Sequence, residues 1–204
     1  GEAVTSFDTS IQNTAPSTQS KATLATIDEG QTVAATQLLS FADNGFGGFS
    51  GRSVETFSYT IDWADGQTDA GTTDIIDGSA GTPTTGTVTG GHTYTDSGLY
   101  TITVTVTDDD GGQLVETIPI TVKNIAPAVD DMPPTVIPAG ARVLFDTAFT
   151  DPGQDDWTAK IDWGRDPDEM QRTIGHDAKS IRVNEQYSTP GSYTAKVTVF
   201  DGDG

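Results

Sequence analysis

The chain of 204 residues carries 30 acidic and only 10 basic side chains, so its formal net charge at pH 7 is −20. This acidity argues against nucleic acid and anionic membranes as partners, and no apolar run approaches the ~20 residues of a membrane span. The chain contains no cysteine. Neither disulfides nor thiolate metal sites can therefore brace it, and bound calcium is the usual alternative for a surface protein of this size.

Residues 1–12 are predicted to form the last strand of a preceding repeat. Residues 1–16 align without a gap with residues 112–127, and both segments end in Asn-x-Ala-Pro. Residues 200–204 align in the same way with residues 107–111, so the end of the chain would continue into its own beginning. Self-similarity at a fixed period is characteristic of repeat architectures. We therefore expect head-to-tail assembly of the chain with itself, through the apolar residues of the first strand: Val4, Phe7 and Ile11.

Two kinds of array are compatible with this pattern. In one, the repeats belong to a single long polypeptide. In the other, residues 2–12 of one chain insert as a donor strand into a neighbouring chain. The repeats are predicted to span residues 13–123 and residues 124–204, and the second would lack its last strand in the absence of such a neighbour.

Strands with one apolar face are predicted in the first repeat. Apolar and polar side chains alternate over residues 59–63, and the same period of two returns over residues 100–107 and 118–122. Such alternation predicts half-buried antiparallel strands. Trp63 and Trp163 share the phase of their apolar neighbours, which favours packing in the core over stacking on a sugar.

Two insertions make the first repeat the longer one. Residues 44–51 are rich in Gly and Phe, and the second insertion lies within residues 67–91, where Gly and Thr predominate. Both compositions predict surface loops. Exposed side chains at Phe46 and Phe49 could form a contact patch for a polysaccharide or a cell-surface receptor.

The second repeat shows the same strand pattern over residues 157–163 and 193–199. No segment of the chain shows a helical period, and Gly, Asp and Pro separate the short strands. Many short strands with this punctuation predict an all-β fold of two tandem immunoglobulin-like antiparallel β-sandwiches. The linker Asn-x-Ala-Pro is short and stiff, because proline restricts the residue before it to extended geometry, and it predicts a rod.

Both repeats resemble the PKD (polycystic kidney disease) family of immunoglobulin-like sandwiches, which carries the motifs W-D-F-G-D-G, H-x-Y and G-x-Y-x-V-x-V and then a D-x-x-G turn. The first repeat has these motifs in order, over residues 61–66, 92–94, 98–104 and 108–111. The second repeat has the first three, over residues 161–166, 185–187 and 191–197. Ile61 and Ile161 replace the first aromatic of the family motif in both repeats. The second repeat also departs from the family at Arg165, which replaces an Asp, and at Glu185, which replaces the His. The resemblance implies a spacer, adhesive or mechanical module of an extracellular protein rather than a catalyst.

The residues do not indicate an enzyme. The only histidines, His92 and His176, occur in no metal-ligand spacing or nucleophile motif. The resemblance implies that His92 packs structurally beside Tyr94. Paired carboxylates could in principle hydrolyse glycosides, but nearly every acidic residue lies at a turn signal, where Asp also has a structural reason to occur.

Acidic residues at turns are predicted to gather at the ends of the sandwiches. Alternate turns of such a fold lie at opposite ends, so the end of one repeat meets the start of the next. At the linker between the repeats we expect one metal-binding group: Asp28, Glu29, Asp62, Asp65, Asn124, Asp151, Asp155, Asp156, Asp201 and Asp203. At the N-terminal end of the first repeat we expect a second: Asn13, Asp43, Asn44, Asp108, Asp109 and Asp110.

Calcium (Ca²⁺) is the cofactor predicted for these groups. It takes six to eight oxygen ligands, and carboxylates held together are costly unless a cation neutralises them. The alternative is a set of solvated turn residues that hold no ion. At the far end of the second repeat, Pro138-Ala139-Gly140 and Arg165 replace acidic residues, so calcium-rich and calcium-poor junctions should alternate along the array.

The function predicted from the sequence is a structural or adhesive repeat segment of an extracellular fibre, surface layer or giant surface protein, stiffened by calcium. Two alternatives are open. One is a carbohydrate- or receptor-binding module that uses the Gly/Phe-rich loop, and the other is an accessory domain of a secreted hydrolase.

Overall fold

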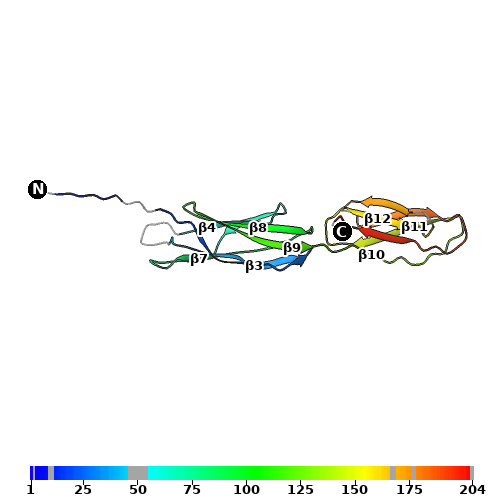
Figure 1. Ribbon diagram of the computed structural model, residues 1–204, viewed down its shortest axis with the longest axis horizontal. Helices are drawn as coiled ribbons and strands as arrows, with labels where there is room; N and C mark the ends of the chain where they lie inside the picture. The colour runs from blue at the N-terminus through cyan, green and yellow to red at the C-terminus, as the bar shows by residue number, and fades with distance from the viewer. Residues whose placement is uncertain (2, 9–11, 46–54, 166–168, 176–177, 203–204) are drawn as a thin grey trace. The chain divides into compact units, whose positions relative to one another are not determined.

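Figure 1 shows the computed structural model of the chain, which describes residues 1, 3–8, 12–45, 55–165, 169–175 and 178–202. The regular elements of this described part are all strands, so it contains no helix long and apolar enough to cross a membrane. The prediction of an all-β chain is confirmed, and its several antiparallel sheets are consistent with a β-sandwich.

Two compact units divide the chain, and each contains segments from distant parts of the sequence. The first unit comprises Gly1–Ala25, Val33–His92 and Leu99–Ile120. The second unit comprises Thr26–Thr32, Thr93–Gly98 and Thr121–Gly204. The second unit therefore includes two short turns from the first half of the sequence, and these turns carry Glu29 and Asp96.

The strands that precede residue 124 form two sheets. They are β1 (Ser17–Lys21), β2 (Ile27–Asp28), β3 (Thr32–Asp43), β4 (Phe57–Asp62), β5 (Thr68–Thr72), β6 (Ile75–Ile76), β7 (Thr84–Thr93), β8 (Gly98–Asp108) and β9 (Gln113–Lys123). One sheet has the order β1-β3-β7-β6 and the other the order β2-β9-β8-β4-β5. Figure 1 shows β3 and β7 in one layer, with β4 and β8 in the other. The pairs β1–β3, β4–β5 and β4–β8 are antiparallel, whereas the short β2 runs parallel to the end of β9.

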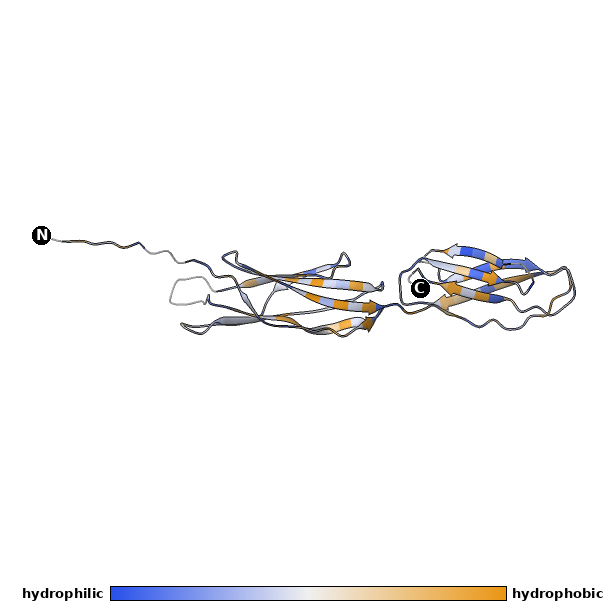
Figure 2. Ribbon diagram, in the orientation of Figure 1, coloured by the Kyte–Doolittle hydropathy of each residue, from blue (hydrophilic) through white to orange (hydrophobic). Residues whose placement is uncertain are grey.

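The apolar faces of these two sheets meet in a core. Phe41 on β3 and Phe57 on β4 place their ring centroids 4.9 Å apart. Gly90 on β7 permits a close approach, because a Cβ there would lie 2.8 Å from Ile61 Cδ1 and 3.2 Å from a ring carbon of Trp63. Trp63 is fully buried, as its phase predicts. Figure 2 shows the hydrophobic bands that alternate along the strands and supply this core.

The later strands form two further antiparallel sheets. They are β10 (Ala128–Val129), β11 (Arg142–Thr150), β12 (Trp157–Asp162), β13 (Glu169–Ile174), β14 (Ser180–Gln186) and β15 (Lys196–Phe200). The sheet orders are β10-β11-β14 and β13-β12-β15. One buried cluster joins side chains of both sheets: Phe149, Trp157, Ala159, Ile161, Trp163, Ile174, Ile181 and Val199. The two sheets therefore pack face to face, and Trp163 lies in the core as predicted.

The Gly- and Thr-rich stretch within residues 67–91 is not the surface loop that its composition predicts. It forms β5, β6 and most of β7, and the longest stretch between these strands is residues 77–83. Val88 anchors β7 in the core with 0% of its surface exposed. Composition misleads here because Thr is β-branched and suits the pleated surface of a strand as well as it suits a loop.

The last strand, β15, begins later than the alternation predicts. The period of two starts at Tyr193, but the strand starts at Lys196. Tyr193 instead packs against Tyr187, with ring centroids 4.4 Å apart, and its hydroxyl donates to the carbonyl of Thr189 at 2.9 Å. This aromatic pair and the local hydrogen bond keep Tyr193 out of the ladder.

The described residues among 1–12 form no strand. Val4 is 86% exposed and Phe7 is 88% exposed, and Ile11 lies outside the described residues. A strand needs a partner edge, so the role of this segment in assembly stays a prediction. Phe46 and Phe49 of the predicted contact loop also lie outside the described residues.

Candidate metal centre

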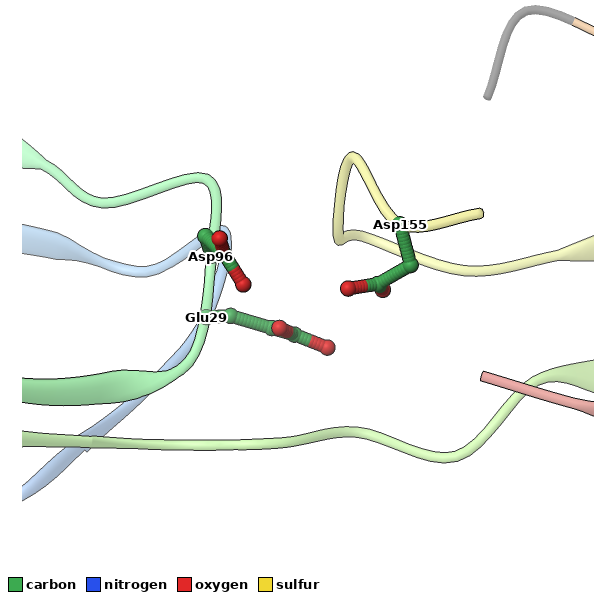
Figure 3. Close-up of side chains that lie close together, drawn as sticks. All are labelled: Glu29, Asp96 and Asp155. Carbon is green, nitrogen blue, oxygen red and sulfur yellow. The ribbon is translucent and has the colours of Figure 1, made fainter. Parts of the chain in front are cut away.

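Three carboxylates from separate turns converge in the second unit. Glu29 lies between β2 and β3, Asp96 between β7 and β8, and Asp155 just before β12. Each offers one oxygen, and these oxygens all lie within 4.8 Å of one another. Figure 3 shows the three side chains directed toward one another from their three loops. We call these residues the Glu29 cluster.

Backbone hydrogen bonds hold the three loops in place. The amide of Gly30 donates to the carbonyl of Tyr94 at 2.8 Å, which joins the first two turns. The amide of Gln154 donates to the carbonyl of Thr95 at 2.9 Å, which joins the loop before β12 to the second turn. Gly30 has a φ of 73°, a left-handed conformation that glycine adopts without steric cost. The convergence of the carboxylates is therefore built into the backbone.

Glu29 is the most buried member of the cluster, with 1% of its surface exposed. Its Oε1 accepts a hydrogen bond from the amide of Ile125 at 2.9 Å, whereas its buried Oε2 has no hydrogen-bond partner within the described residues. Burial raises the pKa of Glu29, and the charges of Asp155, Asp151 and Asp201 raise it further against the opposing effect of the Ile125 amide. A buried carboxylate oxygen without a donor is costly, and a cation would satisfy it.

A second orphaned oxygen belongs to the linker. Asn124 Nδ2 donates to Asp201 Oδ2 at 2.9 Å, but the buried Oδ1 of Asn124 has no hydrogen-bond partner within the described residues. The side-chain amide of Asn124 therefore orients Asp201, whose charge raises the pKa of Glu29.

The loop before β12 is shaped around the cluster. Asp151 Oδ1 accepts a hydrogen bond from the amide of Gly153 at 2.7 Å, and its Oδ2 accepts one from Trp157 Nε1 at 3.2 Å. A Cβ at Gly153 would lie 2.3 Å from Asp155 Oδ2 and 3.1 Å from Glu29 Cδ. The space beside the two carboxylates thus exists because residue 153 has no side chain.

Sequence reasoning found part of this cluster. Of the group predicted at the linker, Glu29 and Asp155 belong to it, and Asp151, Asp201 and Asn124 lie around it through the contacts above. Asp96 was missed. Its turn, Thr95-Asp96-Ser97-Gly98, carries the same kind of acidic turn signal as Asp28-Glu29-Gly30, so this signal could have identified it.

The other residues of the predicted group take different positions. Asp62 Oδ1 accepts a hydrogen bond from the amide of Ala64 at 2.9 Å, and Asp65 Oδ2 lies 2.6 Å from His92 Nε2. Asp28 and Asp156 are sequence neighbours of the cluster but are not among its three close carboxylates. Asp203 lies outside the described residues.

A second acidic cluster lies in the first unit, where the sequence predicts one. Asp43 is 3% exposed and Asp108 is 5% exposed. Asn13 Nδ2 lies 3.1 Å and 3.0 Å from the two carboxylate oxygens of Asp108, and the Gly45 amide donates to Asp43 Oδ1 at 2.5 Å. The buried Oδ2 of Asp43 has no hydrogen-bond partner within the described residues.

Glu55 completes this second cluster and was not predicted. Burial raises the pKa of Glu55 to about 7, with further contributions from Asp109 and Asp43. The predicted members Asn44 and Asp110 are both exposed. We call Asn13, Asp43, Glu55, Asp108 and Asp109 the Asp43 cluster.

The two clusters occupy equivalent positions in the repeats. Phe41-Ala42-Asp43-Asn44-Gly45 corresponds to Phe149-Thr150-Asp151-Pro152-Gly153, each at the end of a strand. Glu55 and Asp155 each lie two residues before the next strand, at Phe57 and Trp157. Asn13 and Asp108 correspond to Asn124 and Asp201 in the aligned segments. The Glu29 cluster adds two carboxylates, Glu29 and Asp96, to this shared arrangement.

Two residues at which the second repeat differs from the first, Arg165 and Glu185, form a pair of their own. Asp65 and His92 contact each other in the first unit, and the residues at their positions in the second repeat, Arg165 and Glu185, form an ion pair with Nη2 and Oε1 2.7 Å apart. The acidic residue thus occupies opposite positions in the two pairs. His92 also stacks on Trp63 with ring centroids 4.8 Å apart, so its described contacts are structural.

The ligand atoms of the Glu29 cluster are all oxygens, which suit hard cations such as Ca²⁺ or Mg²⁺ rather than zinc. No protein-family model matches the chain, and a search of curated proteins finds no match either.

Proposed function

We propose that this chain is a structural or adhesive repeat segment of an extracellular fibre, surface layer or large surface protein, stiffened by calcium at the Glu29 cluster. Its repeats are two tandem immunoglobulin-like sandwiches of the PKD type. The sheet orders support this reading, because β1-β3-β7-β6 matches the sheet ABED of an immunoglobulin sandwich and β9-β8-β4-β5 matches the opposite sheet, GFC with its added strand.

The observation that carries the calcium proposal is the environment of Glu29. Its carboxylate is almost completely buried, keeps one oxygen without a donor, and lies among other carboxylates. In the absence of a cation such a group must either be protonated or suffer repulsion from its neighbours. Calcium is favoured over magnesium because it accepts irregular sets of six to eight oxygens, whereas magnesium demands a near-ideal octahedron.

A cation at this position would link loops that are far apart in the chain. Glu29, Asp96 and Asp155 lie on three separate loops. A shared ion restrains these loops more strongly than their backbone hydrogen bonds do alone, which is the mechanical role expected of a repeat segment.

Calcium-dependent stability tests this proposal. We expect saturating calcium to raise the melting temperature of the chain by roughly 5–10 °C, because calcium at about a hundred times its Kd stabilises the folded state by ~2.7 kcal/mol. Glu29→Gln keeps the shape of the side chain but removes its charge, and should abolish most of this shift. Asp77→Asn changes an exposed acid in the first unit and should leave the shift intact. No shift in the wild type, or an equal shift in Glu29→Gln, would refute the calcium site.

Head-to-tail assembly of the chain with itself needs a separate measurement. The denatured mass of the protein from its natural source distinguishes the two kinds of array. A mass near 21.3 kDa from filamentous material would indicate separate subunits joined through residues 2–12. A mass many times larger would indicate one covalent array. Globular material of low mass would contradict head-to-tail assembly.

A further inference from the structure

Lys179 contacts the loop that carries Asp155. Its Nζ donates to the carbonyl of Asp151 at 2.6 Å and to the carbonyl of Gly153 at 3.1 Å. The same ammonium lies 4.9 Å from the centre of the Trp157 ring, within the range of a cation–π contact. Lys179 and its three partners all belong to the second unit.

The two carbonyls need a donor because their residues are buried. Asp151 and Gly153 are both buried, and the loop between β11 and β12 has no strand partner for them. A buried carbonyl without a hydrogen bond is costly. Lys179 supplies both donors from one charged group, and such charge-assisted hydrogen bonds are stronger than neutral ones.

In the first unit, a neutral hydroxyl donates the hydrogen bond to the equivalent carbonyl. Gly45 occupies the position of Gly153, and its carbonyl accepts a hydrogen bond from Thr84 Oγ1 at 2.7 Å. The buried Thr84 hydroxyl in turn accepts a hydrogen bond from the amide of Gly78 at 3.0 Å. The feature common to the two repeats is therefore the hydrogen bond to this carbonyl, whereas the charge of the donor differs.

We propose that Lys179 is a positioning residue for the Glu29 cluster: by fixing the carbonyls of Asp151 and Gly153, it holds Asp155 beside Glu29. The prediction for calcium affinity rests on the proposed function. The prediction for the loop itself does not, because the hydrogen bonds of Lys179 exist without a cation.

Positioning and simple electrostatics predict opposite effects when Lys179 is neutralised. Lys179 carries a positive charge near a site for a cation, so its removal should tighten calcium binding if charge alone matters. If Lys179 positions the loop, its removal should weaken calcium binding. The loop would then be disordered before binding, and ordering it would reduce the net free energy of binding. The sign of the change therefore separates the two roles.

Calcium titration by isothermal calorimetry measures this sign. Lys179→Met retains the apolar stem over Trp157 and removes both hydrogen bonds, and we expect its Kd for calcium to rise about tenfold. Lys179→Arg keeps a charged donor and should return the Kd to within about threefold of the wild type. Lys160→Met is the matched control, because Lys160 lies on β12 and contacts Glu169 and the Phe200 ring rather than the loop. An unchanged or lower Kd in Lys179→Met would overturn the proposal.

Hydrogen exchange in EDTA tests the loop without calcium. The amide of Gly153 is bonded to Asp151 and that of Gln154 to Thr95, so both report on the order of the loop. We expect their exchange to accelerate about tenfold or more in Lys179→Met and to stay at the wild-type rate in Lys160→Met. Unchanged exchange would overturn the positioning role. A wild type that binds no calcium but shows accelerated exchange in Lys179→Met would refute the proposed metal site while supporting the role of Lys179.

Discussion

The Asp43 cluster and the Glu29 cluster lie beside equivalent loops of the two repeats, yet they differ in the carboxylates that surround these loops. Each loop has an Asp at or directly after the end of a strand, a Gly two residues later, and an acid two residues before the next strand. The Glu29 cluster also receives Glu29 and Asp96 from two further turns. The comparison teaches that the number of carboxylates gathered beside equivalent loops of two repeats can depend on the neighbouring turns.

The equivalent turns of the second repeat keep a backbone hydrogen bond but lack the two carboxylates. The amide of Gly140 donates to the carbonyl of Tyr187 at 2.8 Å, as the amide of Gly30 does to Tyr94. The positions of Glu29 and Asp96 are occupied there by Ala139 and Thr189. This difference agrees with the expectation that calcium-rich and calcium-poor ends alternate, which stays a prediction.

The largest effect is expected from Gly153→Ala. Its methyl group would lie 2.3 Å from Asp155 Oδ2 and so displace a buried carboxylate from the Glu29 cluster. We expect calcium affinity, measured by calorimetry, to fall at least about a hundredfold, since a displaced charged ligand costs ~3 kcal/mol or more. Gly175→Ala is the control, because a Cβ there would have no neighbour within 4 Å. Wild-type affinity in Gly153→Ala would show that this space is not used.

A matched pair of variants compares the two clusters directly. Asp155→Asn removes the charge before β12 in the second unit, and Glu55→Gln removes the equivalent charge in the first. We expect Asp155→Asn to weaken the tightest calcium site about tenfold or more, and Glu55→Gln to change it less than about threefold. Calorimetric titration of both variants measures this difference. If Glu55→Gln had the larger effect, the tighter site would lie in the first unit.

The pH dependence of stability without calcium should reveal the crowding of carboxylates. Burial raises the pKa of Glu55 to about 7 from the ordinary value of 4.5, and the pKa values of Glu29 and Asp43 are raised by burial as well. The folded state therefore binds more protons than the unfolded state between these limits. We expect the free energy of unfolding in EDTA to increase as pH falls from about 7 to about 5, and to decrease as pH rises through 7.

Urea denaturation at a series of pH values measures this dependence. Glu55→Gln should flatten the slope, because the residue that titrates near neutrality is gone. Asp65 does not contribute in this range: burial raises its pKa, but hydrogen bonds from His92 and the Gln67 amide outweigh that effect and lower it. Its stabilising effect is lost only in stronger acid. A free energy of unfolding that decreases as the pH is lowered from about 7 to about 5 would contradict the raised pKa values.

The smallest effect concerns the contact between Asp65 and His92 and its counterpart, the ion pair of Arg165 and Glu185. Asp65→Arg places a cation beside His92 and should destabilise the first unit by ~1 kcal/mol, because the pair is only partly exposed. Adding His92→Glu recreates the arrangement of Arg165 and Glu185 and should recover part of this loss, though not the stacking of His92 on Trp63. A double-mutant cycle by urea denaturation measures the coupling. Strict additivity would show that the two positions do not act as a pair.

Much of the fold could be predicted because strand side chains point alternately to opposite faces. The burial of Trp63 and Trp163 and the strands around them follow from this local rule. The rule does not decide where a strand begins, so Tyr193 was placed in a strand it does not join. Composition is a weaker guide to secondary structure than alternation is, because it predicted a loop where β5, β6 and most of β7 lie.

By itself, the sequence determined the repeat, the all-β class, the buried tryptophans and the presence of acidic turns at Glu29 and Asp43. Only the tertiary structure decided which acids meet. Asp96 and Glu55 were missed because the approach of two turns depends on the order and register of strands far apart in the chain, which no local pattern encodes. Asp62 and Asp65 lie outside the three close carboxylates for the same reason: Asp62 accepts a hydrogen bond from the amide of Ala64, and Asp65 contacts His92. Local alternation fixes the direction of each side chain, whereas convergence requires the whole sheet.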